Sequence, residues 1–177
     1  MATTYEEILT LVRELAEAQK ATDLQIKETS REIAELRSLF TSQWGKLMES
    51  LVEGDLVNLL RARGIAITDT STRLKRQLAD GGHCEFDILA HSGDELVVVE
   101  VKTTLRPKDV KAFLRKLDQF KQWLPRYANN RILGAMAWLS ADAGAEAMLA
   151  KRGLFSIRAT GDSAAIQNER DFALRAW

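Results

Sequence analysis

The sequence has few of the residues that crosslink chains or bind soft metals. Its 177 residues include a single cysteine, Cys84, and two histidines. A single thiol excludes both an internal disulfide and a zinc site built from several cysteines, and two histidines disfavour a histidine cage. A metal ion in this protein would therefore be held by oxygen ligands.

Long apolar runs and a net charge are also missing. No stretch approaches the ~20 consecutive apolar residues that a membrane-spanning helix needs. Residues 1–7 contain two acids and lack the apolar core of a secretory signal. The 25 Lys and Arg balance the 25 Asp and Glu, and 46% of the residues are apolar, which is typical of a folded soluble domain. We therefore expect a cytoplasmic protein without membrane contact.

The zero net charge conceals an uneven distribution of charge along the chain. Residues 1–42 carry eight acids and five bases, whereas residues 101–131 carry nine bases and two acids. Such a basic segment inside a neutral protein indicates either a local anionic partner or a solvated helix face.

Glycine and proline are absent from the first 44 residues, and apolar residues recur there in heptads. The pattern predicts a helix of about 36 residues, which is too long for the core of a compact domain. We expect a coiled-coil segment over residues 1–42 that forms a homodimer; the alternative is a helix folded back on its own domain. Polar residues in the middle weaken the pairing or fix its register. The predicted seam is Ile8, Val12, Leu15, Gln19, Thr22, Ile26, Thr29, Ile33, Leu36 and Phe40.

Residues 43–177 are predicted to form one α/β domain. Turn residues join two of its strands into a hairpin, and a polar connection over residues 69–82 precedes them. The order α-β-β-β-α-β predicts a mixed sheet flanked by helices. The predicted elements are a helix over 43–63 that ends at Gly64, a strand over 65–68, hairpin strands over 84–90 and 95–103, a helix over 107–124, a strand over 131–140, a helix over 141–152 and a strand over 154–160.

Charged residues interrupt both strands of the predicted hairpin. Side chains alternate along a strand, so Glu100 and Lys102 share one face of the valine-rich second strand, and Glu85 and Asp87 share a face of the first. Converging carboxylates repel each other and are commonly stabilised by a hard cation such as Mg²⁺. A nearby lysine can then orient or deprotonate a water. The alternative is a simple ion pair at the strand end.

Asp87, followed after a hydrophobic run by Glu100-Val101-Lys102, resembles the motif of the PD-(D/E)XK nuclease superfamily, the restriction-endonuclease-like fold. Upstream, Trp44-Gly45 is similar to the first core helix of archaeal Holliday-junction resolvases and related small bacterial proteins. The preceding heptads are similar to uncharacterised bacterial and archaeal proteins with a coiled coil before a nuclease-like domain. The resemblance covers roughly residues 43–160.

The resemblance implies that Asp87, Glu100 and the carbonyl of Val101 bind Mg²⁺, with Mn²⁺ as a substitute. It implies that Lys102 is the catalytic lysine and that cleavage leaves a 5′-phosphate. Phe86 stands where many members have proline, a common departure. The first core helix offers two further acids for the same site, Glu49 and Glu53.

Basic residues beside this site would contact phosphates without reading sequence. We expect a magnesium-dependent DNA nuclease, directed by DNA structure rather than sequence because no recognition domain is present. The alternative is a non-catalytic module for nucleic-acid binding or coiled-coil assembly on a nuclease-like scaffold, with an unidentified protein partner. The candidate phosphate contacts are Lys108, Lys111 and Arg115 after Lys102, and Arg73, Lys75 and Arg76 before Asp87.

Overall fold

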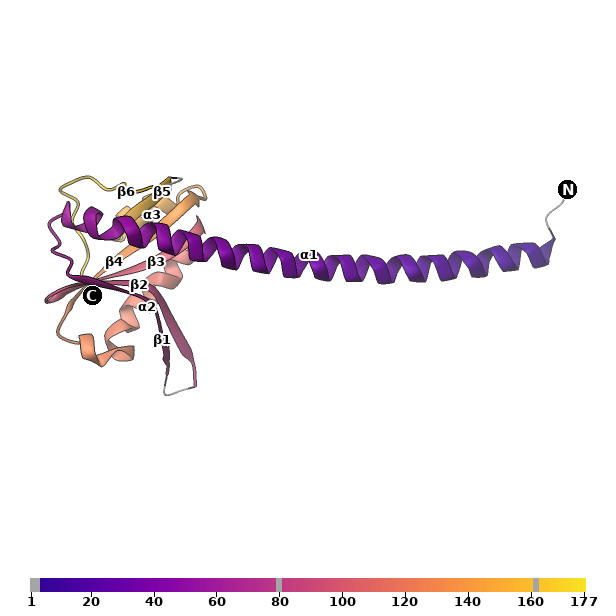
Figure 1. The fold of residues 1–177 in the computed structure, drawn as a ribbon, viewed down its shortest axis with the longest axis horizontal. Coiled ribbons are helices and arrows are strands. Elements are labelled where there is room, and N and C mark those ends of the chain that lie inside the picture. The colour runs from indigo at the N-terminus through magenta and orange to yellow at the C-terminus, as the bar shows by residue number, and fades with distance from the viewer. Residues whose placement is uncertain (1–3, 79–80, 161–162) are drawn as a thin grey trace. The chain divides into compact units, whose positions relative to one another are not determined.

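The computed structural model describes residues 4–78, 81–160 and 163–177 (Figure 1). The chain divides into two compact units, Met1–Gln43 and Trp44–Trp177. The predicted seam position Phe40 and the motif residue Trp44 have side chains outside the described set. In all, seven helical residues have side chains outside the described set: Arg37, Ser38, Phe40, Thr41, Ser42, Trp44 and Leu47.

One helix, α1 (Tyr5–Arg61), continues through 57 residues, so the predicted break near residue 43 is wrong. Gly45 and Gly54 both lie inside this helix. A glycine within a helix costs only about 1 kcal/mol relative to alanine. Met48 and Val52, which lie between the two glycines, are buried, and the free energy gained from such burial exceeds the cost of one glycine.

Local hydrogen bonds cap both ends of α1, and the helix ends at Gly64 as predicted. At the start, the backbone N–H of Thr4 donates to Glu7 Oε2 at 2.9 Å, which is half of a capping box. At the end, Gly64 has φ +83°, and the backbone N–H of Ile65 donates to the Leu60 carbonyl at 3.1 Å. The left-handed glycine therefore ends the helix in the manner of a Schellman motif.

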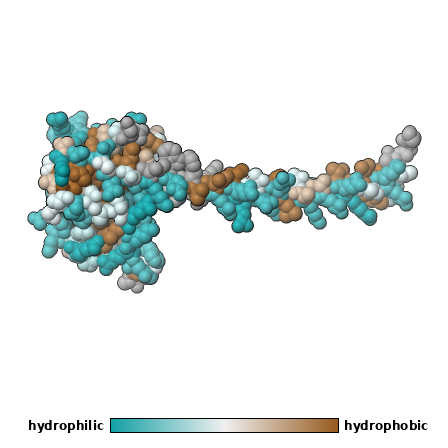
Figure 2. Space-filling model, in the orientation of Figure 1, coloured by the Kyte–Doolittle hydropathy of each residue, from teal (hydrophilic) through white to brown (hydrophobic). Residues whose placement is uncertain are grey.

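In the first unit, the apolar seam positions whose side chains are described are exposed. Ile8 is 48% exposed, Leu15 68%, Ile26 58% and Ile33 54%. Figure 2 shows apolar residues recurring between polar ones along this helix. A single chain leaves this apolar stripe in contact with water, and the predicted homodimer would cover it.

The second unit contains one six-stranded sheet in the order β1-β2-β3-β4-β5-β6. Its strands are antiparallel to their neighbours except for β3–β4 and β4–β5, which are parallel and are connected through helices. The remaining elements are β1 (Asp69–Gln77), β2 (His83–Ser92), β3 (Glu95–Leu105), α2 (Pro107–Trp123), the 3₁₀ turn η1 (Pro125–Tyr127), β4 (Arg131–Ala141), α3 (Ala145–Lys151), β5 (Phe155–Thr160) and β6 (Ser163–Ile166).

The beginning of the sheet differs from the prediction. Residues 65–68, predicted as a strand, have no regular secondary structure, although Ile65 and Ile67 are buried. The strand β1 lies instead in the segment predicted as a connection. Its residues are mostly exposed, since β1 is an edge strand, so it lacks the apolar alternation that marks half-buried strands.

The end of the sheet also differs in detail. The helix predicted over 141–152 is shorter, because β4 continues to Ala141 and Gly144 has φ +80° directly before α3. The four-residue strand β6 was not predicted from the sequence.

Apolar side chains fill both faces of the sheet, and the described helices cover them. The predicted fold class is thereby confirmed: a mixed sheet flanked by helices in the order α-β-β-β-α-β, after a long N-terminal helix. None of the helices in the described ranges is long and apolar enough to cross a membrane. The α1-side core includes Met48, Val52, Leu56 and Leu60 of α1, Ile88 of β2, and Val97, Val99 and Val101 of β3. The α2-side core includes Val110, Phe113, Leu117 and Phe120 of α2, with Phe86 of β2 and Leu96 and Val98 of β3.

Gly134 in β4 allows Leu117 of α2 and Leu154, which directly precedes β5, to pack against the backbone of the sheet. A Cβ at this position would lie 2.5 Å from Leu154 Cδ2 and 2.7 Å from Leu117 Cδ1. Both distances are shorter than real Cβ contacts, so any larger residue at 134 would displace these leucines.

Candidate active site

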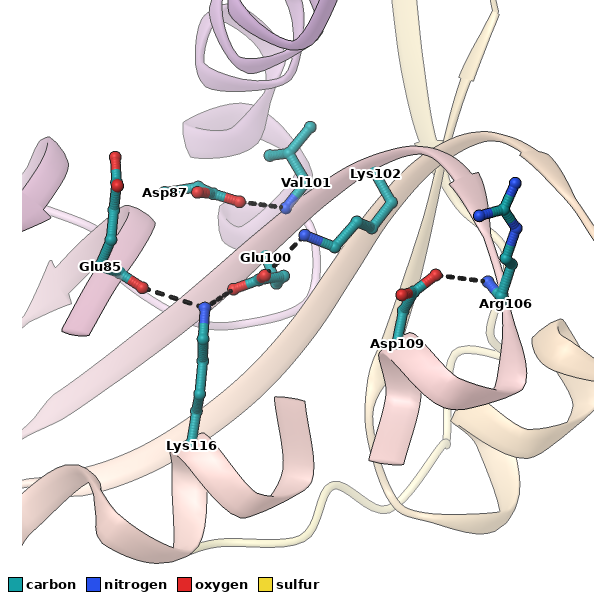
Figure 3. A network of polar contacts seen from close by, with 8 residues as sticks. All are labelled: Glu85, Asp87, Glu100, Val101, Lys102, Arg106, Asp109 and Lys116. Atoms are coloured by element: carbon teal, nitrogen blue, oxygen red, sulfur yellow. Dashed lines mark hydrogen bonds and ion pairs between the residues drawn. The ribbon is translucent and has the colours of Figure 1, made fainter. Parts of the chain in front are cut away.

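The candidate site lies where β2 and β3 separate. The two strands are paired from Ser92↔Glu95 to Ile88↔Val99. Beyond that point, Asp87 Oδ2 accepts a hydrogen bond of 2.7 Å from the backbone N–H of Val101 (Figure 3). The carboxylate of Asp87 therefore satisfies a backbone donor that a paired strand would otherwise satisfy.

Beside Asp87, the side chains of β1 and β2 change the face of the sheet to which they point. Phe86 packs in the α2-side core and Ile88 in the α1-side core, although regular alternation would place both on the same face. Opposite them, Arg73 lies between the pairs Thr72↔Ile88 and Leu74↔Phe86, and its φ is +53°. Arg73 lies opposite Asp87, and its left-handed conformation changes which side chains of β1 and β2 point to each face of the sheet.

Glu100 is buried, with 6% of the residue exposed. Each of its carboxylate oxygens is bound by a lysine: Oε1 by Lys102 Nζ at 2.8 Å and Oε2 by Lys116 Nζ at 2.8 Å. Lys116 also donates to the backbone carbonyl of Glu85 at 3.0 Å (Figure 3). With Asp87 ionised, the two acids and two lysines have formal charges that sum to zero.

The pKa values of two groups are shifted in this site. Burial, together with the nearby Glu100 carboxylate, raises the pKa of Asp87 to about 6, against the opposing effects of the Val101 N–H, Lys102 and Lys116. Burial acts to lower the pKa of Lys102, but the Glu100 carboxylate, together with Asp87 and Asp109, outweighs it, and the pKa of Lys102 is raised. Lys102 is thus held as an ammonium, which favours orienting water and stabilising negative charge over removing a proton.

The donor set fits a hard divalent cation with few protein ligands. Across the described ranges, no three His, Cys, Asp or Glu side chains group together as a metal cage. Asp87 and Glu100 are two such donors, and Mg²⁺ is commonly held by one or two carboxylates together with waters and phosphates. The carbonyl of Val101 stays a predicted third ligand.

The two helical acids are engaged elsewhere. Glu49 Oε2 accepts from Arg73 Nε at 2.7 Å, and Glu53 Oε1 accepts from Thr70 Oγ1 at 3.2 Å. Both therefore bind β1. Within the described residues, neither acid shares a hydrogen bond or ion pair with Asp87. The structure thus brings Asp87, Glu100 and Lys102 together but does not join Glu49 or Glu53 to them.

The predicted phosphate contacts fall into two groups. On α2, Lys108, Lys111 and Arg115 are exposed and form no ion pair with any described residue. On β1, two of the three basic residues are already paired, since Arg73 binds Glu49 at 2.7 Å and Lys75 lies 3.5 Å from Glu85. The exposed face of α2 is therefore more available than β1 for binding an anionic ligand.

Lys116 was missed by the sequence reasoning. It lies three residues after Phe113 and four before Phe120, both buried. This spacing places it at the edge of the apolar face of α2 rather than on the exposed basic face. A lysine at that boundary, on the helix that follows an acidic strand, is the signal that could have identified it.

No family model matches the chain, and no curated protein matches it. Three similar solved structures are a protein of unknown function, a repair endonuclease from Pyrococcus abyssi and EndoMS in a complex with dsDNA. Their identities to this chain are 16%, 20% and 19%, with TM-scores of 0.41, 0.37 and 0.37. The matches cover 62%, 63% and 60% of this chain and 58%, 46% and 44% of those chains. This chain therefore spans about half the length of each protein.

Proposed function

We propose that this protein is a metal-dependent nuclease that hydrolyses phosphodiester bonds in DNA. The observation that carries the proposal is the convergence of Asp87, Glu100 and Lys102 where β2 separates from β3. Two neighbouring carboxylates in a largely buried site, one with its pKa raised to about 6, form an arrangement that a divalent cation would stabilise.

The residues of the site have distinct roles in this proposal. Asp87 and Glu100 would hold Mg²⁺ or Mn²⁺ with the carbonyl of Val101. When bound, the cation would polarise the scissile phosphate and lower the pKa of a water. Lys102 would orient that water and stabilise the charge that develops on the phosphate oxygens. The superfamily resemblance implies a 5′-phosphate product.

The DNA would lie along the exposed face of α2. Lys108, Lys111 and Arg115 occupy this face, and α2 begins two residues after the end of β3. Lysines and arginines on a helix surface bind the phosphate backbone without distinguishing bases. Strand ends, branches or a partner protein would then select the site of cleavage.

Pairing of the N-terminal helix would place two such sites in one assembly. The exposed apolar seam of the first unit supplies the contact surface, and a second copy of the same helix supplies its complement. Two sites in one dimer could act on the two strands of a duplex or of a junction.

One observation favours the alternative, a non-catalytic module on the same scaffold. Glu100 has both oxygens bound by lysines at 2.8 Å, so the acid is already neutralised inside the protein. A binding module that never takes up metal would be stable with this arrangement.

The decisive experiment compares Asp87→Ala with the wild-type protein for metal binding and DNA cleavage. Asp94→Ala, an exposed acid in the turn between β2 and β3, is the matched control. Single-stranded, duplex and four-way-junction DNA would be incubated with Mg²⁺, Mn²⁺ or EDTA, and cation binding measured by calorimetry. We expect cleavage and binding in the wild type and the control, and loss of both in Asp87→Ala. Absence of both cation binding and cleavage in the wild type would favour the non-catalytic module.

A further inference from the structure

In this structure, cationic side chains of the protein itself bind the carboxylate of Glu100. Lys116 reaches Glu100 Oε2 at 2.8 Å from α2, an element separate from the strand that carries the acid. Lys102 binds the other oxygen from two residues further along β3. Glu100 therefore has two internal counter-cations, and they come from different parts of the fold.

The two lysines differ in how they are held. Lys102 lies two residues from Glu100 on the same strand and binds it at 2.8 Å, which ties this ammonium to the acid. Lys116 divides its ammonium between Glu100, the Glu85 carbonyl at 3.0 Å and the ring of Phe86, whose centre is 5.8 Å away. Lys116 thus keeps two contacts beside the site even when its bond to Glu100 is broken.

A metal ion on Glu100 would compete with these ammonium groups. A divalent cation and an ammonium on one carboxylate repel each other, and the repulsion is strong because the site is shielded from water. Lys116 is the group better placed to yield, because the Glu85 carbonyl and the Phe86 ring still hold its ammonium and its helix also carries the exposed basic residues Lys111 and Arg115.

We propose that Lys116 neutralises Glu100 in the metal-free protein and transfers to a phosphate of the substrate when the metal ion binds. This inference rests on the proposed function and adds a regulatory element to the same site. Before metal and DNA arrive, Lys116 keeps the buried carboxylate paired. Once both are present, the released ammonium lies between the metal site and the basic face of α2, where it can bind the negative charge of the phosphate.

The test compares Lys116→Met with Lys116→Arg in the full-length protein. Methionine keeps the unbranched apolar stem against Phe86 and removes the charge, whereas arginine retains the charge. Lys121→Met, at the last turn of the same helix and without an ion pair to any described residue, is the matched control. Mn²⁺ affinity without DNA is measured by calorimetry, cleavage at saturating Mn²⁺ by gel assay, and folding by thermal melting.

We expect Lys116→Met to bind Mn²⁺ about 10-fold more tightly than the wild type, because one competing positive charge is removed, and to cleave DNA about 100-fold more slowly. Lys116→Arg should return both quantities toward wild type, and Lys121→Met should change neither. If the wild type binds no Mn²⁺ but Lys116→Met does, Lys116 is the competing cation, which also supports the inference.

Two results would overturn the inference while leaving the proposed function intact. Unchanged or weaker Mn²⁺ binding by a folded Lys116→Met protein would mean that Lys116 positions Glu100 rather than competing for it. Tighter binding with normal cleavage would show that Lys116 has no contact with the substrate. Absence of Mn²⁺ binding in every variant would instead overturn both the inference and the proposed metal site.

Discussion

The carboxylate of Asp87 accepts a hydrogen bond of 2.7 Å from the backbone N–H of Val101. The same carboxylate therefore satisfies a backbone donor of β3 and belongs to the candidate metal site. The bond joins two strands that are no longer paired at this point. Removal of the carboxylate therefore has a structural consequence, an unsatisfied backbone donor, in addition to any catalytic one. Substitution by asparagine is the cleaner test because its amide oxygen can still accept this bond.

Asp87→Asn should change how stability depends on pH. Burial and Glu100 raise the pKa of Asp87 from 3.8 to about 6, with Lys102 and Lys116 opposing the shift. Between these values the folded protein binds more protons than the unfolded chain, so stability falls as the pH rises through this window. In EDTA, the stability of Asp87→Asn relative to wild type should rise by on the order of 2 kcal/mol between pH 4 and pH 7.5.

Urea unfolding at several pH values in that range measures this difference. Asp94→Asn, in the exposed turn, serves as the control and should follow the wild type throughout. A constant difference between Asp87→Asn and wild type would mean that the Asp87 carboxyl titrates normally.

Lys102→Ala should lower DNA cleavage by about 10²-fold or more, while the protein still folds and binds metal at least as tightly as the wild type. The reason is that Lys102 acts on water and the phosphate rather than on the metal ion. Thr103→Ala, the neighbouring substitution on β3, is the control. Single-turnover cleavage and calorimetry check the two expectations separately. Loss of metal binding in Lys102→Ala would show that its main role is to hold Glu100.

Lys111→Ala combined with Arg115→Ala should weaken DNA binding in EDTA and reduce its dependence on salt. Each phosphate contact that is lost lowers the slope of log K against log[salt] by about one, so a decrease of about one to two is expected. Fluorescence anisotropy across a salt titration gives the slope. Lys20→Ala with Lys27→Ala removes the same charge from the N-terminal helix and should leave the slope unchanged. An equal decrease in both variants would place the binding face elsewhere.

Ile26→Asp combined with Ile33→Asp should convert a full-length dimer into a folded monomer, because each places a charge in the predicted seam. Lys20→Asp with Lys27→Asp, on the outward face of the same helix, should remain dimeric. A protein lacking residues 1–40 should also be monomeric and should cut paired-strand substrates less well. Light scattering distinguishes these states. A monomeric wild-type protein would contradict coiled-coil pairing.

The sequence was most informative where burial dictates the pattern. The valine-rich run before Glu100 identified β3, and the helix predicted over 107–124 corresponds to α2; both elements pack against the core. The same alternation placed Glu100 and Lys102 on one face, which the structure bears out. The local apolar pattern was sufficient to predict these elements, because contacts distant in sequence do not alter their regular alternation or helical spacing.

Where exceptions occur, they arise from contacts distant in sequence. The edge strand β1 has little apolar alternation because most of its residues are exposed. The change of face between Phe86 and Ile88 depends on the left-handed conformation of Arg73, an arginine that no rule for turns would select. Lys116 could be recognised only once the packing of α2 against the sheet was known.

That packing depends on a position with no charge and no role in chemistry. Gly134 lets Leu117 rest on the backbone of β4, with only 2.7 Å between its Cδ1 and the place of a Cβ. Lys116 precedes Leu117 in the same helical turn. The distance of the helix from the sheet therefore determines whether the ammonium of Lys116 can reach Glu100. A single methyl group added at residue 134 would displace the side chain of Leu117 and so disturb the packing that positions Lys116 beside Glu100. Mutational tolerance measured in the interior of β4 would therefore report on the ion pairs of the site, even though no residue of the site had been altered.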